Sequence, residues 1–176
     1  MSERISVIKE KDKLIITIKA FCDQQKQKML LWWIVLFTIC GIVILSQFFG
    51  NYDSGTKVFF AVYVAFWIFF EFKVVYAYRW RKYGEEQLIL ENGELLLIKN
   101  IGKRGVTQRI EFEEIQKVDF YSDTNNGFIK SMNDSYWNIN KYNLIIKLEN
   151  SVVPFAIDIT NKEAKKISHE IQNFIR

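Results

Sequence analysis

Residues 29–49 form an uncharged apolar run that constrains the fold more than any other feature of this 176-residue sequence. The run matches the roughly 20 apolar residues that an α-helix needs to cross a bilayer. The alternative is a core helix of a soluble protein, but such a helix seldom runs this long without a polar face. We therefore predict a membrane-spanning helix here.

A second apolar segment follows after a short polar connection. Residues 50–57 are rich in the Gly, Asn, Asp and Ser that form turns. Residues 58–78 then form a second predicted span, which reaches membrane length only by including Glu71 and Lys73. Because the connection is so short, we expect the two helices to be antiparallel neighbours.

Basic residues at the predicted helix ends indicate the orientation. They lie before the first span and after the second, whereas the connection contains only Lys57. By the positive-inside rule, we expect both termini to be cytoplasmic in a multi-pass protein of the cell (inner) membrane. The same residues are candidates for contact with anionic lipid, although they can equally serve only to set topology. They are Lys26, Lys28, Arg79, Arg81 and Lys82.

Charge and cysteine usage exclude some classes of protein. A net charge of +4 fits a protein that faces anionic lipid and does not predict nucleic-acid binding, which requires a concentrated basic face. A charged stretch precedes the first apolar run, so no cleavable signal peptide is expected. Cys22 and Cys40 are interpreted as reduced thiols, because one precedes the span and the other lies inside it. Lipidation is the alternative for Cys22.

After the second span the pattern changes from helical to alternating. Gly84 is expected to end the helix in the left-handed conformation. An Asn-Gly pair at Asn92 and Gly93 then predicts a β-hairpin between strands 87–91 and 94–101. Further strands are predicted in residues 106–115, 117–122, 143–150 and 151–159.

Three smaller features complete the predicted domain. Pro154 indicates that the last strand lies at a sheet edge or bulge. The polar loop 123–141 is interpreted as mobile or involved in recognition. Residues 5–8 and 14–18 resemble a hairpin that can pair with the later sheet.

The chain closes with a predicted amphipathic helix. Thr160 and Glu163 have the spacing of a capping box. An apolar stripe then runs along one face and is expected to pack on the sheet. The stripe consists of Ala164, Ile167, Ile171, Phe174 and Ile175.

These patterns predict three regions: an N-terminal β-hairpin and linker (1–28), a two-helix transmembrane hairpin (29–83) and a cytoplasmic domain (84–176). The predicted fold class is a membrane α-helical hairpin plus an α+β cytoplasmic domain. Several antiparallel strands closed by one helix resemble a pleckstrin-homology-like (PH-like) domain, an antiparallel sheet or roll.

The layout is similar to small two-span bacterial membrane proteins with a cytoplasmic PH-like domain. It resembles more distantly the photosystem assembly factor that has two spans followed by a soluble domain. The resemblance implies an adaptor that docks onto lipid headgroups or other proteins. It does not extend to phosphoinositide binding, because Lys9, Lys11 and Lys13 are interleaved with Glu10 and Asp12 and the arginines of that pattern are missing.

The sequence predicts no catalytic residues, cofactor or metal. The single histidine, His169, has no Cys or His cluster around it in sequence, so zinc is not indicated. Glu111 and Glu113 would share one face of a strand, most simply the solvated one, whereas general acids usually lie in a desolvated cleft. We therefore expect a non-enzymatic protein.

Of all the residues considered, Glu71 is the one that a purely structural role explains least well. Counted back from Tyr78, it lies about 10 Å inside the inner end of the helix, where an ionisable group is costly. Either the span is shifted and Glu71 reaches the interface, or Glu71 makes a helix–helix contact. Thr38 is the nearest candidate within the chain, but a second copy or another membrane protein is the stronger hypothesis for its partner.

Three functional hypotheses follow from these observations. The first is a membrane-anchored adaptor or assembly factor that binds a protein partner or the inner membrane surface. The second is an accessory subunit of a larger membrane transport or secretion complex that uses Glu71 as a contact. The third, a membrane enzyme, requires a clustered active site that the sequence does not show. Membrane lipid and either a protein partner or a homo-oligomer are the expected partners.

Overall fold

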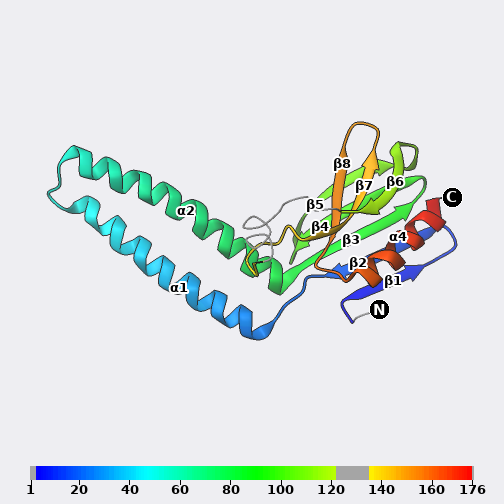
Figure 1. The fold of residues 1–176 in the computed structure, drawn as a ribbon, viewed down its shortest axis with the longest axis horizontal. Coiled ribbons are helices and arrows are strands. Elements are labelled where there is room, and N and C mark those ends of the chain that lie inside the picture. Colours follow the sequence, from blue (N-terminus) through cyan, green and yellow to red (C-terminus); the bar gives the residue numbers. More distant parts are fainter. Residues whose placement is uncertain (1–2, 122–134, 176) are drawn as a thin grey trace. The chain divides into compact units, whose positions relative to one another are not determined.

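The computed structural model describes residues 3–121 and 135–175 (Figure 1). Two compact units make up the chain. The sheet unit combines Met1–Phe21 with Trp80–Arg176, and the helical unit is Cys22–Arg79. Each unit is considered separately below.

Within the described residues, the first five strands of the sheet unit form one antiparallel sheet in chain order. These strands are β1 (Ile5–Lys9), β2 (Lys13–Lys19), β3 (Gly84–Glu91), β4 (Glu94–Ile101) and β5 (Arg104–Glu111). The predicted hairpin is confirmed, since Asn92 and Gly93 join β3 to β4 with φ values of 52° and 81°. The N-terminal strands also pair with the later sheet, with Ile16 opposite Leu88.

A second antiparallel sheet, again counted over the described residues, has the order β6-β7-β8. Its strands are β6 (Ile115–Phe120), β7 (Tyr142–Leu148) and β8 (Val152–Ile157). Pro154 therefore lies in an edge strand, as predicted. The predicted strand 106–115 is wrong in its second half, because a 3-10 turn, η2 (Phe112–Glu114), ends the first sheet and redirects the chain. Of the loop predicted at 123–141, residues 123–134 lie outside the described part.

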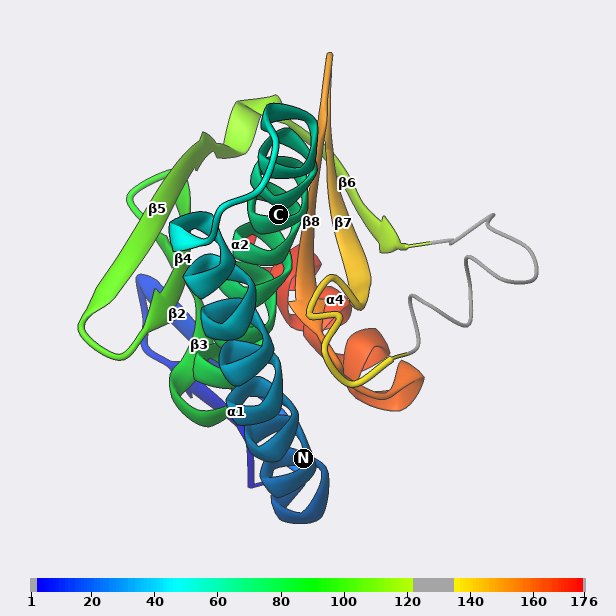
Figure 2. The ribbon, with the colours of Figure 1, turned by 90° about the vertical axis from the view of Figure 1, so that its left-hand side faces the viewer.

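The closing helix α4 (Asn161–Ile175) begins with the predicted capping box. The Thr160 amide donates to Glu163 Oε2 at 3.0 Å, and the Glu163 amide donates to Thr160 Oγ1 at 3.3 Å. The helix packs against β6, β7 and β2 (Figure 2). Ala164, Ile167 and Ile171 are fully buried in one core with Leu and Ile side chains from both sheets. The antiparallel sheet domain with a C-terminal helix is thus present.

Gly84 does stand at the end of the second helix, but for a different reason from the one predicted. Its φ is not positive, and the residue is the first of β3. A Cβ at this position would overlap the backbone oxygen and the indole ring of Trp80. Glycine is therefore required for close approach, and the predicted left-handed conformation is wrong.

The helical unit contains α1 (Gln24–Ser46), the 3-10 turn η1 (Gln47–Phe49) and most of α2 (Ser54–Tyr83). α1 begins before the predicted run 29–49 and ends within it at Ser46, where η1 follows, whereas α2 extends beyond the predicted run 58–78 at both ends. Aspartates cap their first turns. Asp23 Oδ1 accepts from the Gln25 amide at 2.9 Å, and Asp53 Oδ2 accepts from the Thr56 amide at 3.0 Å. An apolar run marks only the middle of such a helix, whereas the cap sets its start.

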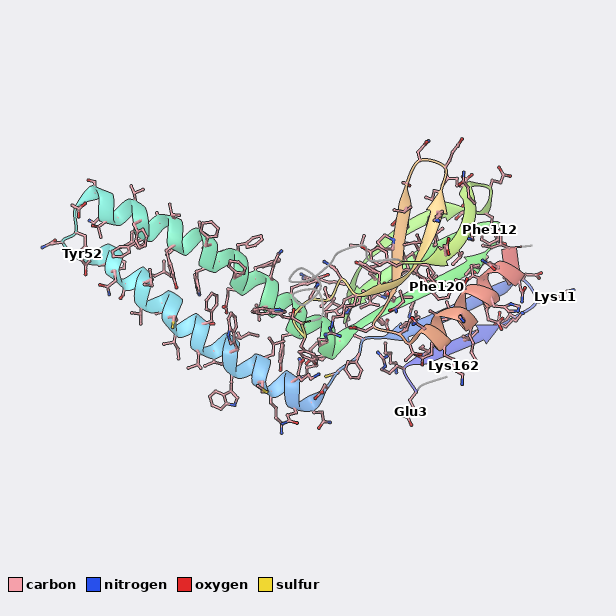
Figure 3. The ribbon with its side chains drawn as sticks, viewed as in Figure 1. Glu3, Lys11, Tyr52, Phe112, Phe120 and Lys162 are labelled. Carbon is pink, nitrogen blue, oxygen red and sulfur yellow. The ribbon has the colours of Figure 1, made fainter. Side chains whose placement is uncertain are left out.

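Within the described residues, two helices are long and apolar enough to cross a membrane. Only 11% of the most apolar stretch of α1 and 6% of that of α2 is buried. The large apolar side chains instead project outward along both helices (Figure 3). Examples are Met29, Trp32, Leu36, Val58, Phe59, Phe66 and Phe72, all exposed. This exposure distinguishes them from core helices of a soluble protein, which bury such residues.

Candidate functional site

The structure brings Glu71 and Thr38 together between α1 and α2. Thr38 Oγ1 donates to Glu71 Oε1 across 2.6 Å. The second carboxyl oxygen, Oε2, is buried and has no hydrogen-bond partner among the described residues. One oxygen is thus bonded within the helix pair, and the other is buried. The geometry favours the contact within the chain over the contact with a second copy.

Two further polar contacts join the same helices. Trp67 Nε1 donates to the Phe37 carbonyl at 3.0 Å, and Gln27 Nε2 donates to the Tyr78 carbonyl at 3.0 Å. The Trp67 indole also lies against Gly41, where a Cβ would overlap the ring. Close packing over a small residue and side-chain hydrogen bonds are the interactions that hold helices together in lipid. Sequence reasoning missed this contact, although Gly41 is the single glycine of the first apolar run.

Four of the five predicted membrane-surface residues have exposed side chains. They are Lys26, Lys28, Arg79 and Lys82. Lys26 lies 4.0 Å from the capping Asp23 carboxylate, and the Lys82 ammonium lies 5.1 Å from the centre of the Tyr83 ring. Interactions of this kind contribute little at exposed sites.

Arg81 does not belong to this set, and its prediction as a membrane-surface contact is wrong. It is only 2% exposed and forms an ion pair with Asp158 inside the sheet unit. Its Nε donates to the Tyr136 carbonyl at 3.2 Å. Its other nitrogens donate to the carbonyls of Phe21 and Asn138 at 3.3 and 3.2 Å. A buried guanidinium is satisfied only by such a complete set of acceptors.

The Arg81 cluster joins three chain segments that are far apart in sequence. They are the exit of β2, the segment before β7 and the turn after β8. Asp158, in that turn, has a φ of 54°, which is unusual for a residue other than glycine. The Asp158 carbonyl also accepts from Arg4 Nη2 at 2.9 Å. The cluster thus stabilises the turn that leads into α4.

A second buried charge, Glu86, links the two sheets. The side chain is 1% exposed, and its Oε2 accepts from the Ile157 amide of β8 at 2.8 Å. Lys99 Nζ lies 3.5 Å from Oε1 and donates to the Pro154 carbonyl at 3.1 Å. Burial raises the pKa of Glu86, while the Lys99 charge and the Ile157 amide act in the opposite direction without cancelling it.

Glu86→Gln is expected to change how stability depends on pH. Because the folded-state pKa of Glu86 is raised, its contribution is fully present below the unfolded value of about 4.5 and is lost as pH rises through the folded value. The unfolding free energy of the parent, relative to that of Glu86→Gln, should therefore fall as pH rises from about 4.5 through the folded-state pKa of Glu86, and should level off above it. Chemical unfolding at a series of pH values measures it, with the exposed Glu111→Gln as control. An equal difference at every pH would contradict the assignment.

Within residues 3–121 and 135–175, no group of three His, Cys, Asp or Glu side chains is arranged to hold a metal ion. His169 is exposed on α4, where its Nδ1 is hydrogen-bonded to the Asn173 amide. Cys22 and Cys40 are exposed free thiols. Nothing in these positions assembles a nucleophile with a base.

The observations define a class of protein: two long apolar helices with exposed apolar surfaces, joined to an antiparallel sheet domain that one helix closes. No protein-family model and no curated protein matches this chain. The functional argument therefore depends on the contacts described above.

Proposed function

We propose that this protein is a non-enzymatic, membrane-anchored adaptor or assembly factor of a bacterial inner membrane. The hairpin of α1 and α2 spans the bilayer, and the sheet unit lies in the cytoplasm with both termini. The observation that carries the proposal is the exposed apolar surface of both helices, since only 11% of the most apolar stretch of α1 and 6% of that of α2 is buried. Water would solvate that surface at a large cost, whereas lipid removes the cost.

The adaptor role is inferred from the sheet unit. Two antiparallel sheets closed by α4 support a PH-like domain, and such domains dock onto lipid headgroups or proteins. The exposed Lys26, Lys28, Arg79 and Lys82 add attraction to anionic lipid of about 1 kcal/mol each near the surface. The protein partner and the membrane surface are therefore the two expected docking targets.

The alternative is an accessory subunit of a membrane transport or secretion complex. In this alternative, Glu71 makes the contact with another membrane protein. Because Glu71 Oε1 is bonded to Thr38 and Oε2 is buried, the carboxyl group is poorly placed for that contact. The adaptor proposal is accordingly the better supported of the two.

The first test concerns topology. A reporter that distinguishes cytoplasm from the opposite side, fused after Arg176, should give the cytoplasmic signal. The same reporter inserted at Asp53, between the helices, should give the opposite signal, because the charge asymmetry predicts that this turn lies on the other side of the membrane. A fusion at the N-terminus serves as control and should match the Arg176 fusion. Identical signals at Arg176 and Asp53 would refute the spanning hairpin.

The second test concerns the partner. The tagged full-length chain is purified in mild detergent, and proteins recovered in stoichiometric amounts are identified. A soluble partner supports the adaptor, whereas a membrane-embedded partner supports the accessory subunit. Recovery of the chain alone, together with no binding to vesicles containing anionic lipid, would count against both proposals.

A further inference from the structure

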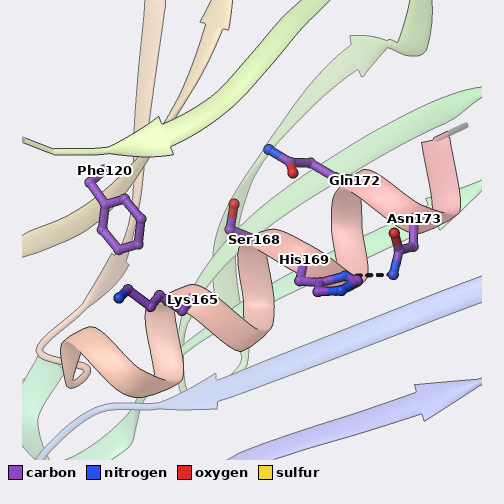
Figure 4. A pocket seen from close by; sticks show the side chains of 6 residues that line it. All are labelled: Phe120, Lys165, Ser168, His169, Gln172 and Asn173. Carbon is purple, nitrogen blue, oxygen red and sulfur yellow. Dashed lines mark hydrogen bonds between the residues drawn. The ribbon is translucent and has the colours of Figure 1, made fainter.

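A pocket of about 300 Å³ opens between the end of β6 and the exposed side of α4 (Figure 4). The Phe120 ring extends from β6 toward the helix, and five side chains of α4 form the rest of the wall. These are Lys165, Ser168, His169, Gln172 and Asn173. Among the described residues, the lining contains one cationic side chain and no carboxylate.

The polar groups in this α4 pocket include both donors and acceptors: Lys165 is the charged donor, whereas Gln172 and Asn173 each have an amide nitrogen hydrogen-bonded within the chain and a carbonyl oxygen that can only accept. Lys165 is exposed, and its ammonium forms no ion pair or hydrogen bond with another described residue. The Asn173 amide is hydrogen-bonded to Nδ1 of His169, and with that nitrogen accepting, the proton of the neutral ring is on Nε2. Ser168 adds a hydroxyl group. The pocket is therefore complementary to an acceptor that carries negative charge.

The charge and size of the pocket limit what it can hold. A single ammonium with neutral donors balances one negative charge, which fits a carboxylate better than a phosphate dianion. A volume of about 300 Å³ is at the lower end of ligand pockets and suits one side chain. Phe120 is 40% exposed and provides an apolar wall for the carbon atoms beside the charge.

The neighbouring strand favours a peptide over a free metabolite. β6 is an edge strand, so within the described chain no other strand pairs with its outer side. An extended segment can lie along such an edge. Two backbone groups of β6 are already hydrogen-bonded within the chain: the Val118 carbonyl accepts from Gln172 Nε2 at 3.0 Å, and the Phe120 amide donates to Asp119 Oδ1 at 2.9 Å. Recognition must therefore depend mainly on a side chain in the pocket.

We propose that the α4 pocket binds a carboxylate side chain in an acidic peptide segment of the partner protein, with Lys165 as its charge partner. The inference rests on the proposed adaptor function for the identity of the partner. Binding of the carboxylate itself is independent of whether the helices span a membrane, so the two proposals can fail separately.

The single histidine of the chain makes the test specific. In the full-length protein in detergent micelles at constant pH, the imidazole resonances of His169 are followed by NMR. The capped dipeptide acetyl-Glu-Leu-amide is the probe, acetyl-Gln-Leu-amide is its uncharged match, and inorganic phosphate is a third arm. We expect a saturable shift with the charged dipeptide that the uncharged dipeptide does not produce.

Two lysine variants complete the design. Lys165→Gln should weaken binding of acetyl-Glu-Leu-amide by about tenfold or more, the loss expected for one charged hydrogen-bond partner. Lys162→Gln, an exposed lysine of the same helix outside the pocket, should change it by less than about twofold. Both sites are exposed, and unchanged thermal unfolding verifies that each variant is folded.

Several results would overturn the inference. They are a His169 response that does not saturate, equal responses to the two dipeptides, or an unchanged affinity in Lys165→Gln. Tighter binding of phosphate than of the charged dipeptide would overturn the assignment to a carboxylate. If the pocket fails these tests while the reporter fusions give opposite signals, the membrane anchor stands without this docking site.

Discussion

Replacing Arg81 by methionine is expected to lower the free energy of unfolding of the sheet unit by about 3–5 kcal/mol. The guanidinium is 2% exposed and pairs with Asp158, whose side chain is itself mostly buried. Methionine fills similar volume but leaves the carboxylate without its cation. It also leaves the carbonyls of Phe21, Tyr136 and Asn138 without the guanidinium donor. Removing one partner of a buried pair is costly because the other charge stays desolvated.

Chemical unfolding of the full-length chain in detergent, followed by near-ultraviolet circular dichroism, measures this loss. Arg79→Met is the matched control, since Arg79 is exposed on the same helix and should change stability by no more than about 0.5 kcal/mol. Adding Asp158→Asn to Arg81→Met should recover part of the loss, because the unpaired charge is then removed. Equal stability of Arg81→Met and the parent would show that the buried cluster does not form.

Ile167→Asp is expected to abolish cooperative unfolding of the sheet unit. Ile167 is fully buried on α4 in the core shared with both sheets. The substitution removes a large apolar side chain, which alone costs about 2–5 kcal/mol, and introduces a charge without a partner. Together these terms are comparable to the whole stability of a typical domain.

Milder and exposed substitutions keep this prediction testable if Ile167→Asp does not fold. Ile167→Val should lower the unfolding free energy by about 0.5–1.5 kcal/mol. Lys166→Asp places the same acidic group at the exposed neighbouring position, and it should leave cooperative unfolding in place. An Ile167→Asp variant that unfolds at the same temperature as the parent would mean that α4 does not pack on the sheets.

Local signals were sufficient to predict most of the elements. The two apolar runs predicted the long helices, because a predominantly apolar stretch of that length has few other stable conformations, even though the second run includes Glu71 and Lys73. Asn92 and Gly93 predicted their hairpin, since both positions require positive φ. Thr160 and Glu163 predicted the start of α4, because their hydrogen bonds are made three residues apart.

The predictions that failed concern residues whose role in the fold differs from the common interpretation of their sequence pattern. Arg81 stands in a basic cluster after an apolar run, which is typical of a membrane interface. Gly84 looked like a residue that ends a helix by its own conformation, but the constraint is contact with Trp80. The turn η2 interrupted a strand whose alternating pattern continued through it. Only for Arg81 does the correction come from residues far away in the sequence, since its partner Asp158 lies 77 positions away.

The sequence by itself determined that this protein has two long apolar helices, a β-rich domain and a closing amphipathic helix. Only the tertiary structure decided which polar groups share the interior. Thr38 and Glu71 lie 33 positions apart, Glu86 and Ile157 lie 71 apart, and Arg81 and Asp158 lie 77 apart. Periodicity and capping report on neighbours within a few residues, whereas a buried charge needs a partner at hydrogen-bond distance in space. The chain topology determines whether the two partners come within that distance, and a local sequence pattern does not contain this information.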